Sequence, residues 1–543
     1  LTQESSHFDD TVHNVLKFHG IYEQDDRDVR QELKLAGKEK RYNFMIRTKV
    51  PGGKLTWEQY LVMDELSTHY ANGTLRITTR QDIQFHGVIK KDLHPTLRKL
   101  NQALVTTLGA CGDIERNVVT CPAPLLDRTR AEVQEYARLI SDDLLPKTKA
   151  YHEIWLNGEK VHTTEQEVEP LYGKTYLPRK FKTSIAFPGD NCVDIYAHDI
   201  GLVAVLTNGN LAGFNVLVGG GMGMTHKRPE THPLLAKPLG YITKERILPV
   251  VEAIVQAQRD FGNRENRMRA RMKYLIEERG IDWFYQEVKK HTAFDLAPIR
   301  EMKWDKTEDH LGWHEMGNGL LFFGIFVENG RIQDLGKLRM KSGLRKIVET
   351  FKPELRLSPQ QNILIGGISP SRKAEFEGLV KEYGIRHETE ISNVERWSMA
   401  CPALPTCGLA LTEGERIFPK VIDDLEKAVA GLGLEDEKIT IRMTGCPNGC
   451  ARPYTSEIGL VGIGIHTYTL FVGGNFEGTR LNQVLLEKVK EIEIVRTLAP
   501  ILEAFRLNRS TGERFGDFCN RMGIEALREL IGVDKKEEPD ERE

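Results

Sequence analysis

Four of the eight cysteines lie within fifty residues of one another, in two close pairs. The pairs are "CPALPTC", Cys401 to Cys407, and "CPNGC", Cys446 to Cys450. Four thiolates in two pairs can hold one Zn²⁺ ion tetrahedrally or anchor the irons of a [4Fe-4S] cluster. Zinc knuckles favour two-residue gaps, whereas these gaps are five and three residues long. The spacing favours a cluster and leaves structural zinc and unrelated buried thiols as alternatives.

A second set of residues, rich in arginine and lysine, lies in the first half of the chain. It comprises Arg47, Arg76, Arg80, Arg116, Arg179, Lys180 and Lys182. Strand alternation along "LRITTR" predicts one face shared by Arg76, Thr78 and Arg80. The same reasoning places Lys180 and Lys182 on one face of a second strand. Cations beside apolar neighbours are costly to bury unless anions meet them, so a small polyanionic ligand suits the pattern better than a solvated sheet face or a nucleic-acid patch.

The segments that are expected to position the cysteines and the cations occur twice in the sequence, as an internal repeat. "LRITTRQDIQFHGV" matches "LRLSPQQNILIGGI" at an offset of 280 residues, which also carries "CPA" at Cys121 onto "CPA" at Cys401. Further on, "IGLVAV" matches "IGLVGI", "LVGG" matches "FVGG", and "FGNRENRM" matches "FGDFCNRM". Because the matches keep the same order, they predict two homologous halves, about residues 44–300 and 318–540. We expect these halves to pack about a pseudo-twofold axis and to share a ligand.

Each half begins with a strand, a helix and a second strand. In the first half, "YNFMIRTKV" predicts a strand, and Thr56 with Gln59 predicts a capping box that begins a helix. That helix is expected to end at residues 72–73, where Asn-Gly tolerates a positive φ. In the second half, "LLFFGIFVENGRI", a helix around 342–351 and a strand from Leu355 repeat this order. The pattern predicts an α+β fold made of α/β-type units.

Composition excludes several classes of protein. The net charge is only -3 at pH 7, so no overall field attracts nucleic acid or an anionic membrane. The longest apolar run, "LLFFGIFV", is far shorter than the roughly 20 residues that span a bilayer, and no secretory signal is visible. Eight cysteines are too few for a disulfide scaffold of this size. From these observations together we expect a cytoplasmic protein with no membrane contact. The charged tail over residues 534–543 predicts disorder.

Several motifs together resemble one known family. "CPALPTC", "TGCPNGCARP", "EIGLVG", "ITTRQDIQFHG" and "YLPRKFKT" are similar to those of the sulfite and nitrite reductases that use sirohaem and a [4Fe-4S] cluster. Within that family the chain resembles the haemoprotein subunits of the assimilatory sulfite reductases. The resemblance implies two pseudo-twofold-related halves, each a ferredoxin-like half-domain plus a sirohaem-binding α/β domain. The implied parts are an N-terminal extension at 1–43, paired half-domains at 44–109 and 312–386, a first sirohaem-binding domain at 110–311, a second one with the cluster at 387–533, and the tail.

The resemblance also implies roles for individual residues. The cluster ligands would be Cys401, Cys407, Cys446 and Cys450, with Cys450 also joining the cluster to the sirohaem iron. The catalytic residues that bind the substrate anion would be Arg47, Arg116, Lys180 and Lys182. The sirohaem contacts would be Arg76, Thr78, Arg80, Gln84, His86, Arg179, Arg271, Asn448 and Cys450.

The implied activity is the six-electron reduction of sulfite to sulfide in sulfur assimilation and cysteine biosynthesis. Lys182 favours sulfite, because related nitrite reductases tend to carry asparagine there. The four remaining cysteines, Cys111, Cys121, Cys192 and Cys519, are scattered, which disfavours the dissimilatory branch with its inserted ferredoxin module. No flavoprotein region is visible, so a NADPH-dependent flavoprotein subunit or a ferredoxin would supply electrons. The alternatives are a ferredoxin-dependent nitrite reductase and an iron-sulfur electron carrier without haem.

Overall fold

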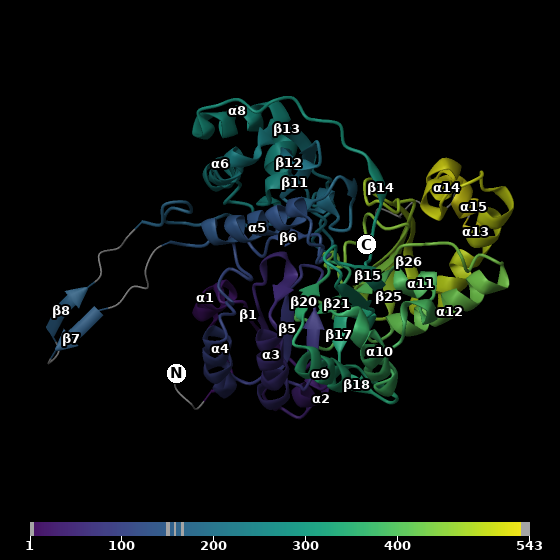
Figure 1. Cartoon of the computed structure of the whole chain (residues 1–543), viewed down its shortest axis with the longest axis horizontal. Coiled ribbons are helices and arrows are strands. Elements are labelled where there is room, and N and C mark those ends of the chain that lie inside the picture. Colours follow the sequence, from purple (N-terminus) through teal and green to yellow (C-terminus); the bar gives the residue numbers. More distant parts are fainter. Residues whose placement is uncertain (1–4, 148–152, 157–158, 164–167, 534–543) are drawn as a thin grey trace.

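The structure, a computed structural model, describes residues 5–147, 153–156, 159–163 and 168–533. The expected α+β fold with two repeated halves is confirmed. In Figure 1 the first large domain lies at the top, the second at the right, and the two small half-domains below them. The tail over 534–543 lies outside the described residues. None of the helices in the described ranges combines the length and the apolar character needed to cross a bilayer.

The two small half-domains are sheets that exchange a strand with each other. The first sheet has the order β1 (Ile21–Asp25), β2 (Tyr42–Arg47), β5 (Ile83–Val88), β4 (Leu75–Ile77) and β17 (Arg331–Ile332). The second has the order β15 (Gly312–Glu315), β16 (Leu321–Ile325), β21 (Ile363–Ile368), β20 (Glu354–Leu357) and β3 (Lys54–Leu55). Each sheet therefore takes its last strand from the other half of the chain. This reciprocal pairing is what a pseudo-twofold relation between the halves requires.

The helices of the small half-domains complete one shared apolar core. They are α1 (His13–Phe18), α3 (Trp57–Tyr70), α4 (Leu93–Gln102), α9 (Met340–Phe351) and α10 (Lys373–Glu382), whereas α2 (Arg30–Leu35) buries no residue and lies outside this core. The predicted capping box is present: the Gln59 backbone N–H donates to Thr56 Oγ1 (3.3 Å), and the Thr56 N–H donates to Gln59 Oε1 (3.1 Å). Helices α3 and α9, equivalent in the two repeats, pack against each other. Because the core includes Leu66 and Leu344, the half-domains are joined by burial as well as by strand exchange.

The two large domains share one sheet topology. The first sheet runs β13 (Lys237–Thr243), β12 (Asn210–Val218), β11 (Ile200–Thr207), β9 (Thr183–Ala186), β6 (Val119–Thr120). The second runs β26 (Gln483–Lys490), β25 (Thr467–Val472), β24 (Ile458–Gly464), β23 (Ile441–Thr444), β22 (Ser398–Ala400). In each sheet the last three strands are parallel and the first two are antiparallel additions. Thus β6 corresponds to β22 and β9 to β23, and the loops after these strands occupy equivalent places.

Helices surround these two sheets. In the first domain they are α5 (Arg128–Asp143), α6 (Ile247–Phe261), α7 (Met272–Arg279) and α8 (Ile281–Thr292); in the second they are α11 (Asn393–Arg396), α12 (Phe418–Gly431), α13 (Ile494–Asn508), α14 (Phe515–Met522) and α15 (Ile524–Leu530). The remaining strands form three short pairings: β7 (Glu153–Leu156) with β8 (Glu159–Thr163), β10 (Gly189–Asp190) with β14 (Trp304–Lys306), and β18 (Asp334–Leu335) with β19 (Leu338–Arg339).

Two strand predictions were too long. Strand β4 ends at Ile77, so Thr78 and Arg80 do not continue the face of Arg76. The backbone turns there because Thr78 Oγ1 accepts the N–H groups of Arg80 (3.1 Å) and Asp82 (3.3 Å). In "LPRKFKT" the strand β9 begins only at residue 183, and the preceding stretch makes a single isolated bridge. Pro178 lacks the N–H group that an earlier ladder would need.

Candidate functional site

The four predicted cluster cysteines lie on two loops at the ends of parallel strands. Cys401 directly follows β22 and Cys407 lies in the loop after it, while Cys446 and Cys450 lie in the loop after β23. Cys401 and Cys446 are buried, Cys407 is half-buried and Cys450 is exposed. Burial and the neighbouring Cys450 raise the pKa of Cys446 to about 12. In the absence of metal Cys446 therefore carries a protonated thiol, and a metal would have to displace its proton.

The donors around these sulfurs fit an iron-sulfur cluster. The Gly445 backbone N–H donates to Cys401 Sγ (3.3 Å), and Asn448 Nδ2 donates to Cys446 Sγ (3.5 Å). No three of these four cysteines have their sulfurs all within 4.8 Å of one another. The one group of Cys, His, Asp or Glu side chains among the described residues that is as compact as that contains none of them. Sulfur ligands of a single Zn²⁺, at about 2.3 Å from the metal, would lie closer together than that. The wider spacing favours a cluster over the zinc alternative.

The loop that carries Cys446 and Cys450 is fixed by a glycine. Gly449 has φ +64°, in the left-handed region, and a Cβ there would lie 2.8 Å from the Tyr454 ring. Tyr454 in turn donates its hydroxyl to the Pro447 carbonyl oxygen (2.9 Å). The tight turn therefore holds Cys450 at the edge of the loop, where its sulfur can face a ligand.

Cys450 faces a cavity whose wall comes from three domains. The cavity and the open solvent at its mouth together enclose about 370 Å³ that no atom fills. Its lining residues are Thr79, Arg80, Lys180, Lys182, Ala197, His198, Met222, Gly223, Arg271, Asn448, Gly449, Cys450 and Arg452. Six of the residues predicted from the sequence are thus brought together at one cavity. No role was predicted from the sequence for Arg452, although it lies in the "TGCPNGCARP" motif, nor for Met222 and Gly223, which lie in a glycine-rich stretch.

The cavity is strongly electropositive because several of its cations have no anionic partner. In the part of the chain that the structure describes, the ammonium groups of Lys180 and Lys182 form no ion pair or hydrogen bond. Burial, and then the neighbouring Arg116 and Arg271, lower the pKa of Lys180 to about 7. Burial and the neighbouring Arg80 hold the pKa of Lys182 well below its usual range. Such uncompensated charge indicates a site for an anionic ligand.

Arg80 fits a ligand with several carboxylates. Its side chain is buried, and Nη2 donates to the Asn117 carbonyl oxygen. Its Nε and Nη1 are buried without a partner among the described residues. Unpaired guanidinium donors match a carboxylate well, because the planar group can donate two parallel hydrogen bonds. The donor set of this cavity therefore fits sirohaem, which carries eight carboxylates.

The other two predicted anion-binding arginines adjoin this cavity. Arg116 donates to the Gly112 carbonyl oxygen (3.1 Å) and lies within electrostatic range of Lys180 and Lys182. Burial opposes its charge, but the neighbouring Tyr22 and Cys111 raise the pKa of Arg116. Burial likewise opposes the charge of Arg47, and the neighbouring Cys111 is the largest of the groups that raise its pKa.

The remaining predicted sirohaem contacts are engaged with protein groups outside the cavity wall. Arg76 pairs with Glu415 (Nε to Oε2, 2.7 Å), and Thr78 caps the turn after β4. Gln84 contacts His86 (3.3 Å), and His86 contacts Arg331 (3.3 Å). Arg179 is half-buried, with Nη1 4.0 Å from Asp113. These residues surround the site, and their contact with a cofactor stays a prediction.

A buried ion-pair network behind the cavity was not predicted from the sequence. Asp194 accepts hydrogen bonds from Arg442 (Nη1 to Oδ2, 2.9 Å) and from Arg452 Nε. Arg452 also donates to the carbonyl oxygens of Thr79 and Pro359, both at 3.0 Å. Burial acts to raise the pKa of Asp194, but Arg442 and Arg452 hold it below its usual range. One carboxylate thus connects both large domains to the turn that carries Arg80.

We expect Asp194→Asn to lower the free energy of unfolding by about 3–5 kcal/mol, because it leaves two buried guanidinium groups without a counter-charge. Since the folded-state pKa is lowered, this stabilisation is present above about pH 4 and is lost as the pH falls through the lowered pKa. The measurement is the first urea-unfolding transition, followed by tryptophan fluorescence. The matched control is Asp142→Asn, which removes an exposed partner of Arg138 and should change stability by less than about 1 kcal/mol. Equal shifts for the two variants would contradict the network.

Comparison with known proteins agrees with this arrangement. Residues 135–296 and 393–539 match the nitrite and sulphite reductase 4Fe-4S domain, and residues 36–103 and 314–383 match the nitrite/sulfite reductase ferredoxin-like half domain. The chain is 46% identical over 518 residues to a "Sulfite reductase [NADPH] hemoprotein beta-component" of Staphylococcus haemolyticus, covering 95% of this chain and 90% of the relative. The relative of the same description from Geobacillus thermodenitrificans is 47% identical over 518 residues, with the same coverages.

A solved structure shares the fold. The NirA protein of Mycobacterium tuberculosis superposes with a TM-score of 0.79 at 23% identity, and the match covers 96% of this chain and 92% of that one. Both halves of the repeat, the four cysteines after β22 and β23 and the full-length similarity lead to the same conclusion: the chain belongs to the nitrite and sulphite reductase family.

Proposed function

We propose that this chain is the haemoprotein subunit of an assimilatory sulfite reductase, which reduces sulfite to sulfide with sirohaem and a [4Fe-4S] cluster. The observation that carries the proposal is the meeting of Cys450 with Lys180 and Lys182 at one cavity. One side of the cavity offers a thiolate to a metal centre, and the other offers positive charge to an anion. A plain electron carrier would need only the first side.

The cysteine loops hold the electron-delivering side. Cys401, Cys407, Cys446 and Cys450 are the proposed cluster ligands, and Cys450 is the proposed bridge because it alone of the four is exposed and lines the cavity. Backbone N–H groups directed at the sulfurs stabilise negative charge there. Arg80, Arg271 and Asn448 also line the cavity and are the best-supported carboxylate or ring contacts. When bound, sirohaem and the cluster supply the iron and the electrons for the reduction.

The cationic side is proposed to bind the substrate and to provide protons. Arg47, Arg116, Lys180 and Lys182 hold the sulfite oxygens by charge-assisted hydrogen bonds. Lys180, whose pKa is lowered to about 7, can release and regain a proton near neutral pH. Protons are required because each sulfite oxygen leaves as water. Arg116 is buried and the other three residues are half-buried, which limits competing hydration of the anion.

The physiological partner is proposed to be a flavoprotein that takes electrons from NADPH. The named relatives are described as components of NADPH sulfite reductases, and the similarity to them covers 95% of this chain. A ferredoxin is the alternative donor. Reconstitution of sulfite reduction with each donor in turn would separate the two, because only the correct donor sustains turnover at low concentration.

A visible spectrum and a substrate comparison test the proposed function. We expect the purified protein to show a Soret band and a separate band in the red, together with acid-labile sulfide. A broad shoulder without a Soret band would indicate an electron carrier, and a colourless zinc protein would overturn the cluster. With reduced viologen as donor, kcat/KM should be higher for sulfite than for nitrite. A much higher value for nitrite would assign the chain to nitrite reduction.

A further inference from the structure

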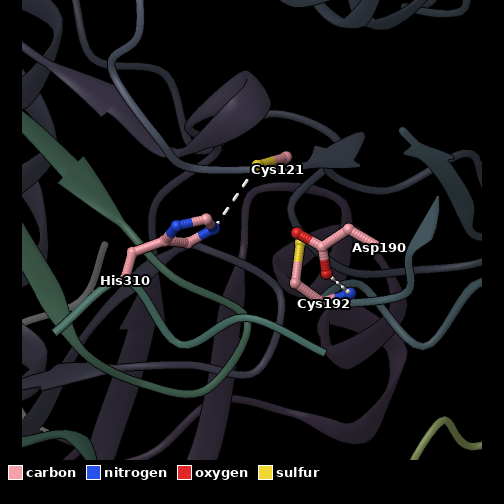
Figure 2. A group of neighbouring side chains, drawn as sticks. All are labelled: Cys121, Asp190, Cys192 and His310. Atoms are coloured by element: carbon pink, nitrogen blue, oxygen red, sulfur yellow. Dashed lines mark hydrogen bonds between the residues drawn. The ribbon is translucent and has the colours of Figure 1, made fainter. Parts of the chain in front are cut away.

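A second group of potential metal ligands lies outside the cavity, in the first large domain. Cys121 directly follows β6, Asp190 ends β10, Cys192 lies two residues later, and His310 lies between β14 and β15. All four residues are buried, and their ligand atoms all lie within 4.8 Å of one another. Figure 2 shows Cys121 and His310 facing each other, with Asp190 and Cys192 beside them. Two sulfurs, one nitrogen and one oxygen thus converge from distant parts of the sequence.

We propose that Cys121, Asp190, Cys192 and His310 bind one Zn²⁺ ion in a structural site separate from the iron-sulfur cysteines. Four protein ligands with no open position are typical of structural zinc, and thiolate, imidazole and carboxylate are all zinc ligands. Both sulfurs are close enough to the other ligand atoms for a single ion, unlike the sulfurs of the cluster set. Binding requires no redox step, because Zn²⁺ only displaces thiol protons.

Neighbouring groups orient these side chains as the surroundings of a metal site do. Asp190 Oδ1 accepts the backbone N–H groups of Cys192 (3.0 Å) and Glu308 (3.1 Å), which fixes the carboxylate. Arg130 Nη1 donates to Cys121 Sγ (3.3 Å) and so favours a thiolate there. Within the group, Cys121 Sγ lies 3.5 Å from His310 Nε2, and the Cys121 thiol also forms a hydrogen bond with the Cys192 thiol. Outer contacts of this kind hold ligands in place before the metal arrives.

The internal repeat relates this group to the cluster cysteines. At the offset of 280 residues that relates the small half-domains, Cys121 corresponds to Cys401, and each directly follows the equivalent strand, β6 or β22. At the offset of 258 residues that carries "IGLVAV" onto "IGLVGI", Cys192 corresponds to Cys450. The first half therefore keeps two of the four thiols at equivalent places. Asp190, two residues before Cys192, and His310, from the chain segment between β14 and β15, complete the set.

The position of the group suggests what the metal stabilises. Strand β10 pairs in parallel with β14, just before His310, so the ion would tie the connecting segment to the first large domain. Gln360 of the second small half-domain donates to the Cys192 carbonyl oxygen (2.6 Å). Asp194, which anchors Arg442 and Arg452, lies two residues after Cys192. A metal at this junction would hold the loop that supports the cavity wall.

Metal analysis of the holoprotein tests the proposal without an activity assay. We expect about one zinc per chain beside the iron, and a loss of more than tenfold in Cys192→Ser with the Soret absorbance retained. The matched control is Cys519→Ser, a buried cysteine elsewhere in the second large domain, which should keep its zinc. Wild-type protein with no zinc would overturn the site. A Cys121–Cys192 disulfide, detected by mass spectrometry after alkylation without reduction, would overturn it too.

X-ray absorption at the zinc edge of the wild-type protein gives a second test that does not depend on a folded variant. We expect two sulfur ligands at about 2.3 Å and two nitrogen or oxygen ligands at about 2.0–2.2 Å. Four sulfur ligands would mean that zinc had entered the cluster cysteines instead, and would overturn the assignment. This test is independent of the proposed function. A protein that reduces sulfite but binds no zinc would refute only the zinc site, and a protein that binds zinc but does not reduce sulfite would refute only the proposed function.

Discussion

Cys450→Ser should reduce viologen-driven sulfite reduction to below about 1% of the wild-type rate, because loss of one donor in a catalytic centre costs at least about 10²-fold. Cys450 is the exposed member of the cysteine set and lies at the cavity that also holds the unpaired lysines. Serine has nearly the same shape, but its hydroxyl is a poor ligand for iron compared with a thiolate. The substitution therefore removes the proposed contact between the cluster and the haem site while leaving the tight turn at Gly449 unchanged.

Two readouts separate loss of the bridge from loss of the fold. Acid-labile sulfide and the visible spectrum report cluster and haem content, and thermal unfolding reports the fold. Cys519→Ser is the matched control, because this thiol is buried in the apolar core of the same domain and should retain activity. Sulfite reduction by Cys450→Ser at more than a tenth of the wild-type rate would refute the bridging role.

The repeat could be predicted from the sequence because the matching segments form equivalent strands and keep the residues that pack in them. "LRITTRQDIQFHGV" and its partner become β4–β5 and β20–β21, the equivalent strand pairs of the two small half-domains. The exchange of β3 and β17 could not be predicted, since a two-residue strand has no periodicity to detect. Likewise, the turn at Thr78 depends on one side-chain hydroxyl bonding the backbone, which alternation alone does not reveal.

At the sites, the sequence did not reveal which residues from distant parts of the chain lie close together. Cys121 and Cys192 look scattered in the sequence, yet the parallel pairing of β6 with β9 brings the loops after these strands together. Asp194 gave no motif signal, and only the fold shows that it pairs with two arginines from the other half. In contrast, the cations of the cavity were predictable, because uncompensated charge in an otherwise buried stretch requires a ligand.

Lys182 lines the electropositive cavity, and its charge should discriminate between two anions. Sulfite carries up to two negative charges, whereas nitrite carries one, so removal of a nearby positive charge weakens the interaction with sulfite more. The effect is large in this setting, because the ammonium group is half-buried and has no ion-pair partner in the described part of the chain. Arg116 and Lys180, close enough to lower the pKa of Lys182 further, stay in place when it is replaced.

We therefore expect Lys182→Asn to lower kcat/KM for sulfite by about 10²–10³-fold, the range found when one charge-stabilising donor is removed from an active site. For nitrite we expect a loss of about tenfold or less, because asparagine can still donate a hydrogen bond to a singly charged anion. Steady-state assays with reduced viologen measure both constants on the same preparation. Lys91→Asn, at an exposed lysine away from the cavity, controls for a general effect of lost charge and should leave both constants unchanged. Equal losses for the two substrates would show that Lys182 contributes to the cavity without selecting sulfite.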